Sequence, residues 1–223
     1  MLDKLNLGNS LFEGFNDKRG VMLCGYEFGE SSLNKDVDST KFNTHATFTF
    51  FDKSPKFNNV LHAPYDDNIK KWVLKLWDLN NPVIPSFDKY FIQTNLAVGS
   101  QNKKSDFDAY KANDESFIEH LSCLEPSIII FFGSELAHHF HRIKQDFRIN
   151  KILGNETESK KVIQHDIKSE NGKFYRRFKI TFFTFDKCRV VVFPNAGGAR
   201  GIADAYISSF KDEMKSIFSF RFD

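Results

Sequence analysis

Cysteine is scarce in this chain and is not spaced for a metal site. The 223 residues include three cysteines, Cys24, Cys123 and Cys188, which lie far apart in the sequence. Their spacing matches no Cys-x-x-Cys zinc or iron–sulfur pattern. An odd number of dispersed thiols is typical of buried, reduced cysteines in an intracellular protein. We therefore expect no metal, no cofactor and a cytoplasmic location.

Long hydrophobic runs and a strong charge of one sign are also absent. No apolar stretch approaches the length that spans a membrane, and the sequence contains no recognisable signal peptide. The net charge of +2 neither requires nor excludes a nucleic-acid partner. Because 41% of the residues are hydrophobic, the chain is long and apolar enough to bury a full core. We expect a single domain over residues 1–223, a monomer, and no membrane partner.

Four short apolar runs, rich in valine, isoleucine and phenylalanine, are typical of strands buried on both faces. They are residues 21–26, 90–94, 127–132 and 190–193. Apolar residues recur at helical spacing in the intervening and following segments, at 66–79, 116–124, 135–147 and 204–218. Strands that alternate with helices predict an α/β fold, with a central, mainly parallel four-stranded sheet flanked by helices.

The segment from residue 149 to residue 187 has a different pattern. It is charged and alternating, and Asn171-Gly172 is a hairpin signal between residues 162–167 and 174–185. We expect an antiparallel β-hairpin extension at the edge of the sheet. Its positive charge fits either a nucleic-acid contact or the solvated face of a hairpin, and lies at Lys160, Lys161, Lys168, Lys173, Arg176 and Arg177.

Polar residues follow each of the four predicted strands. Parallel strands place their carboxyl ends along one edge of a sheet, where ligands bind in open α/β folds. Glu27, Asn95, Ser134 and Asn195 should therefore converge there. The last strand runs into residues 195–201, whose glycines let main-chain amides approach an anion and whose arginine adds further donors. A flexible turn before the last helix is the alternative interpretation.

The order and content of these strand ends resemble the uracil-DNA glycosylase superfamily. Residues 25–30 (Gly-Tyr-Glu-Phe-Gly-Glu) correspond to its first motif, and residues 91–96 (Phe-Ile-Gln-Thr-Asn-Leu) to the strand whose asparagine reads a flipped base. Residues 126–133 match its Pro-x-hydrophobic-Gly strand, and residues 193–195 (Phe-Pro-Asn) stand where most members have His-Pro-Ser or Asn-Pro-Ser. The resemblance implies that family's three-layer fold, with the hairpin as an extension.

The resemblance also implies roles for individual residues. Glu27 would be the carboxylate that steadies the sugar's developing positive charge or activates water, and Asn95 would read the polar edge of the extruded base. The residues alone also fit Glu27 as an acid in a helix's first turn and Asn95 as a strand-end turn. Phenylalanine is abundant, and Phe42 is a candidate for stacking on that base. Further positions implied to contact substrate or DNA are Gly25, Tyr26, Phe28, Gly29, Glu30, Gly133, Ser134, Phe193, Asn195, Gly197, Gly198 and Arg200.

Two departures from the family pattern bear on the substrate. Phe28 replaces the proline of the first motif, and Phe193 replaces the histidine that stabilises the leaving base in many relatives. The resemblance therefore implies a DNA glycosylase that excises a damaged or modified base. A modified cytosine of phage DNA and uracil are the candidate bases, and repair and antiviral defence are the candidate roles. The DNA partner would be single- or double-stranded. The alternatives are a catalytically silent nucleic-acid-binding or sensing module of the same fold, and a hydrolase of free nucleosides.

Overall fold

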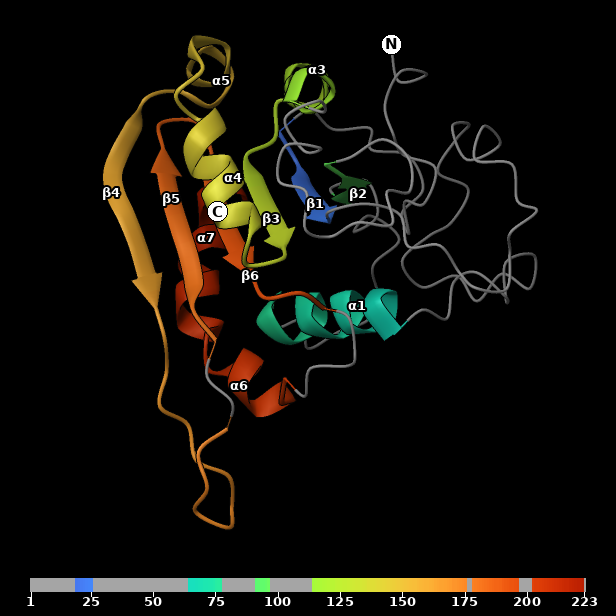
Figure 1. Cartoon of the computed structure of the whole chain (residues 1–223), viewed down its shortest axis with the longest axis vertical. Helices are drawn as coiled ribbons and strands as arrows, with labels where there is room; N and C mark the ends of the chain where they lie inside the picture. Colours follow the sequence, from blue (N-terminus) through green and yellow to red (C-terminus); the bar gives the residue numbers. More distant parts are fainter. Residues whose placement is uncertain are drawn as a thin grey trace, which may run out of the picture.

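A computed structural model describes residues 19–25, 64–77, 91–96, 114–175, 178–196 and 202–222. The described strands form one six-stranded sheet in the order β2-β1-β3-β6-β5-β4 (Figure 1). Strands β2, β1, β3 and β6 are parallel to one another. Strand β5 is antiparallel to β6, and β4 is antiparallel to β5. The strands are β1 Val21–Gly25, β2 Phe91–Asn95, β3 Ile128–Phe132, β4 Glu156–Ile163, β5 Ile180–Phe185 and β6 Arg189–Phe193.

The predicted α/β class is confirmed, but the sheet is larger than the four strands expected. β5 pairs with β6 and β4 pairs with β5, so the antiparallel extension is continuous with the parallel strands. The reason is the composition of β5, whose sequence Ile-Thr-Phe-Phe-Thr-Phe is almost wholly buried. Such a strand is stabilised by pairing within the sheet, where helices cover it. β4 begins at Glu156, earlier than predicted, because its charged, exposed first residues carry no apolar signal.

Helices cover both faces of the sheet, and Figure 1 shows α4 in front of it and α7 behind it. The predicted helix at 135–147 divides in two because Asp146 has extended backbone angles and its side chain accepts from Arg148 N, which starts a new helix. The last predicted helix also divides, at the turn formed by residues 209–210. One face carries α1 Pro64–Trp77, α6 Asp204–Ser208 and α7 Lys211–Phe222, and the other carries α3 Asp114–Leu124, α4 Leu136–Ile143 and α5 Phe147–Leu153.

The core has two halves, one on each side of the sheet. Successive strand residues alternate between them: Leu23 belongs to the half under α1, α6 and α7, and Cys24 to the half under α3, α4 and α5. Every residue of β1 and β3 is buried. The prediction of strands buried on both faces is therefore confirmed for these two strands.

The cysteines are unpaired, as predicted. Cys24 and Cys188 are buried, and Cys123 is partly exposed. Burial raises the pKa of the Cys24 and Cys188 thiols well above the ordinary range, because a thiolate would lose its hydration. These two thiols therefore act as small apolar groups of the core.

Phe140 connects α4 to the sheet, and its removal should be costly. Its ring is fully buried, with its centroid 5.5 Å from that of Phe131 and 5.1 Å from that of Phe183. Because Phe140→Ala leaves a cavity, we expect it to lower the free energy of unfolding by about 3–5 kcal/mol, measured by urea denaturation. Phe147, which is 76% exposed, is the matched control; Phe147→Ala should change stability by less than about 0.5 kcal/mol. Equal losses in the two variants would contradict this packing.

Candidate functional site

The described ends of the four parallel strands meet along one edge of the sheet. Gly25 is paired in register with Asn95, and Phe132 with Phe193. Since neighbouring strands lie about 4.8 Å apart, the ends of β2 and β6 are separated by roughly 15 Å. The predicted alignment of carboxyl ends along one edge is confirmed for β1, β2, β3 and β6, and the convergence of the four side chains there stays a prediction. We call this the carboxyl edge.

The chain reverses direction across the sheet between β1 and β3. The connection from β1 to its neighbour β2 contains α1, which lies on one face of the sheet. The connection from β2 to β3, on the other side of β1, contains α3, which lies on the opposite face. In doubly wound sheets, such a reversal leaves a crevice outside the carboxyl ends of the two central strands, and ligands bind there. Gly25 ends β1, and Gly133 with Ser134 follows β3. The reversal therefore lies between two of the predicted site segments.

Backbone hydrogen bonds hold the strand ends beyond the regular ladder. Leu96 N donates to Gly25 O over 2.9 Å, and Gly133 N donates to Phe193 O over 2.9 Å. Leu136 N then donates to Gly133 O, which turns the chain into α4. Gly133 is buried, whereas Ser134 is exposed just before that helix. The hydroxyl of Ser134 is thus accessible at the carboxyl edge.

The segment after β6 is tied to α1. Asn68 Nδ2 donates to Ala196 O over 2.7 Å, and Ala196 is buried while Asn195 is partly buried. Phe193 is fully buried, with its ring centroid 6.2 Å from that of Phe132 and 6.4 Å from that of Trp72. Phe193 is thus a core aromatic covered by α1. Contact of Phe193 with a substrate stays a prediction.

Several predicted site residues cannot be placed in this edge. For Asn95 the structure describes the backbone within β2. The roles of the undescribed residues stay predictions. Outside the described residues lie Tyr26, Glu27, Phe28, Gly29, Glu30, Phe42, Gly197, Gly198 and Arg200.

Sequence reasoning missed the contribution of α1 to this edge. Asn68 bonds to a residue 128 positions away, and no local pattern signals such a contact. Trp72 lies in the segment 66–79, whose apolar spacing predicts a helix with one buried face, and it is buried. Its indole Nε1 is buried without a hydrogen-bond acceptor among the described residues. The ring of Trp72 packs against Phe132 and Phe193, the last residues of β3 and β6, so this donor lies near the carboxyl edge.

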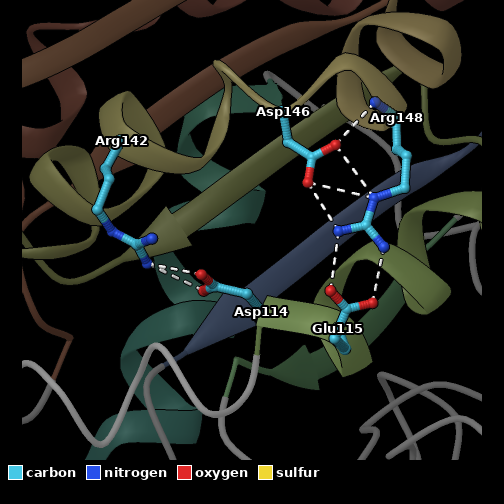
Figure 2. Close-up of polar contacts among 5 residues, drawn as sticks. All are labelled: Asp114, Glu115, Arg142, Asp146 and Arg148. Atoms are coloured by element: carbon cyan, nitrogen blue, oxygen red, sulfur yellow. Dashed lines mark hydrogen bonds and ion pairs between the residues drawn. The ribbon is translucent and has the colours of Figure 1, made fainter.

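A cluster of charged side chains joins α3, α4 and α5, the three helices on the opposite face of the sheet from α1 (Figure 2). The Arg148 guanidinium contacts Asp146 Oδ2 at 2.7 Å and both carboxylate oxygens of Glu115 at 2.7 and 2.8 Å. Nearby, Arg142 Nη2 lies 2.8 Å from Asp114 Oδ2. Hydrogen bonds from Arg148 lower the pKa values of Glu115 and Asp146, and those carboxylates raise the pKa of Arg148. Both carboxylates are therefore charged and paired.

His139 lies beside this cluster, and its protonation is suppressed. Its Nε2 is 3.2 Å from Asp114 Oδ1, and its Nδ1 is 3.3 Å from Arg142 Nη2. Burial is the main cause that lowers the pKa of His139 to about 4, with Arg142 adding to the shift and Asp114 opposing it. Shifted pKa values occur at active sites and also in structural ion-pair networks. The paired arginines and carboxylates here favour the structural role, linking α3, α4 and α5. Within the described ranges, no three His, Cys, Asp or Glu side chains are grouped as metal ligands.

No protein-family model matches the chain, and no curated protein matches its sequence. Among the described helices, none is both long and apolar enough to cross a membrane. Function must therefore be inferred from the residues and from the geometry of the carboxyl edge.

The suppressed pKa of His139 predicts a pH-dependent contribution to stability. The folded value of about 4 lies below the ordinary value near 6.5, so between these values the unfolded chain binds more protons. Neutral His139 therefore stabilises the fold fully above about pH 6.5, and this contribution is lost as the pH falls toward 4. Relative to His139→Gln, the wild-type protein should lose on the order of 2 kcal/mol between pH 7 and pH 5 in urea denaturation.

The exposed neighbour of this residue offers a control. His138→Gln should keep the wild-type dependence of stability on pH, since His138 lies on the outer side of the same helix. An identical pH dependence in His139→Gln and the wild-type protein would show that His139 is not held neutral by burial.

Proposed function

We propose that this protein is a DNA glycosylase that extrudes a damaged or modified base and hydrolyses its N-glycosidic bond. The observation that carries the proposal is the chain reversal between β1 and β3 at the carboxyl edge. There, parallel pairing places the end of β1 beside the end of β2, in register at Gly25 and Asn95, and beside the end of β3, which the Gly133-Ser134 turn follows. Glu27 follows Gly25 by two residues in the sequence.

The chemistry of these residue types suits cleavage of the bond between base and sugar. The reaction develops positive charge on the sugar, which a carboxylate such as Glu27 stabilises while it orients or deprotonates the attacking water. The amide of Asn95 offers both a donor and an acceptor, which suits the polar edge of an extruded base. Ser134, which follows the buried Gly133, is exposed at this edge and adds a polar side chain beside these strand ends.

The burial of Phe193 supports a substrate other than plain uracil. Its hydrocarbon ring cannot donate a hydrogen bond to a base that departs as an anion, so that charge must be stabilised elsewhere. We infer that the pocket takes a modified base, with a modified cytosine of phage DNA as the first candidate and uracil as the reference substrate.

The second candidate function is a catalytically silent module that binds or senses modified DNA. The observation that favours it is also Phe193, because a buried ring replaces the expected donor. Such a module would retain the strand ends and Asn95 for recognition. It would bind a modified strand tightly and leave the glycosidic bond intact.

An excision assay separates these functions. Oligonucleotides carrying uracil, xanthine or glucosylated hydroxymethylcytosine are incubated with the protein, and abasic sites are revealed by alkaline strand cleavage. We expect cleavage on at least one substrate, and Glu27→Gln should slow it by about 100-fold or more, as loss of a general base or charge-stabilising carboxylate does. The control Glu119→Gln, at an exposed position of α3, should retain the wild-type rate.

Each outcome of the assay has one meaning. Tight binding to a modified strand without abasic product identifies the silent module. Base release from free nucleosides but not from DNA identifies a nucleoside hydrolase. Excision at an unchanged rate in Glu27→Gln contradicts the role given to this carboxylate.

A further inference from the structure

The positive charge of the chain is concentrated in one short segment. Residues 160–179 contain seven Lys or Arg and two Asp or Glu, a net charge of +5, whereas the whole chain carries +2. The rest of the chain is therefore net negative. An uneven distribution of this kind is the electrostatic footprint of a surface that meets a polyanion.

This segment extends from the same edge of the sheet as the candidate site. β4 is antiparallel to β5, and β5 is antiparallel to β6, so β4 runs in the direction of the parallel strands. Its last residue, Ile163, therefore lies toward the carboxyl edge. Figure 1 shows the orange chain after β4 projecting past α6 on that side of the molecule.

The tip of the segment is an ordered hairpin. Lys168 and Phe174 form an antiparallel bridge, and Tyr175 N donates to Ile167 O over 2.9 Å. Gly172 has φ of +77°, and its N–H donates to Ser169 O over 2.9 Å. A turn followed by a left-handed glycine is a common three-residue hairpin loop. The hairpin turn predicted at Asn171-Gly172 is thus confirmed.

The base of the hairpin is fixed to α6 and α7. His165 stacks on Phe210 with ring centroids 4.2 Å apart, and its Nδ1 and Nε2 lie 2.9 Å from Ser209 Oγ and 3.0 Å from Glu213 Oε1. On the returning side, Phe178 N donates to Tyr206 Oη over 3.0 Å. These contacts hold the hairpin against the body of the protein, which lowers the entropy lost when it binds a partner.

Other side chains of the hairpin face solvent. Lys168, Lys173 and Phe174 are exposed, and Phe174 is 55% accessible, which is unusual for a phenylalanine. Lys168 Nζ lies 4.9 Å from the centroid of the Phe174 ring. Lysines that reach phosphates, beside an aromatic ring on which an unpaired base can stack, are the combination found in proteins that bind single-stranded nucleic acid.

We propose that residues 160–175, together with Lys179, form a basic arm that binds the DNA strand flanking the extruded nucleotide. The lysines contact phosphates, and Phe174 stacks on an unpaired base of that strand. This inference rests on the proposed function for its choice of DNA as the partner. The arm and the carboxyl edge would then contact one continuous strand, because both lie on the same side of the sheet.

Binding to an unmodified single-stranded oligonucleotide, measured by fluorescence anisotropy at several salt concentrations, tests the arm. The double variant Lys168→Gln, Lys173→Gln should bind about tenfold more weakly at low salt and reduce the slope of log affinity against log salt by about 1 to 2. Phe174→Ala should weaken binding roughly tenfold without changing that slope, since stacking releases no counterions. The double variant Lys151→Gln, Lys215→Gln, at exposed positions on α5 and α7, should behave as wild type.

The outcomes distinguish the arm from the proposed function. Unchanged affinity and slope in Lys168→Gln, Lys173→Gln overturn the arm, even if the protein excises a base. Loss of binding in these variants supports the arm, even if no base is ever excised, in which case the proposed function alone fails. Stronger binding to phosphatidylserine vesicles than to DNA, lost in the same variants, would also overturn it and assign the arm to a membrane surface.

Discussion

The parallel pairing of β1 between β2 and β3 is the constraint from which the rest of the structure follows. Parallel neighbours cannot be joined by a tight turn, so the chain must cross over the sheet each time, with helices on its faces. Both faces of β1 are consequently buried, and its residues alternate between two cores. The same pairing brings strand ends that are distant in the sequence, Gly25 and Asn95 among them, to one edge. The backbone ladder alone thus brings the segments of the candidate site to one edge of the sheet.

Much of this arrangement could be predicted from residue patterns, and the exceptions have physical causes. The buried strands were visible because they are continuous apolar runs, and the hairpin turn because Asn171-Gly172 favours a left-handed backbone. β4 was mostly missed because exposed Glu and Lys residues carry no apolar periodicity. The break before α5 was missed because Asp146 interrupts the backbone while the apolar pattern continues through it. The Asn68 contact with Ala196 depends on tertiary structure alone.

The ion pairs that join the helices and the candidate site lie in different parts of the molecule. Among the described residues, the groups with the most strongly perturbed ionisation, apart from the buried thiols, lie in the α3–α4–α5 layer, where Arg148 and Arg142 join the helices. The carboxyl edge instead combines backbone groups, the segment after β6 and α1. Phe193 belongs to both, since its fully buried ring completes the core at the end of β6. This residue connects the packing of the edge to the substrate that we propose.

Hydrogen–deuterium exchange with and without a DNA strand containing a modified base tests most directly whether the carboxyl edge is the binding site. Slower exchange on binding is expected in peptides that contain the ends of β1, β2, β3 and β6, with α5 unchanged as an internal reference. These peptides include Gly25, Leu96, Ser134 and Ala196. Slower exchange confined to the α3–α4–α5 layer, or unchanged exchange at the four strand ends while DNA is bound, would contradict the account.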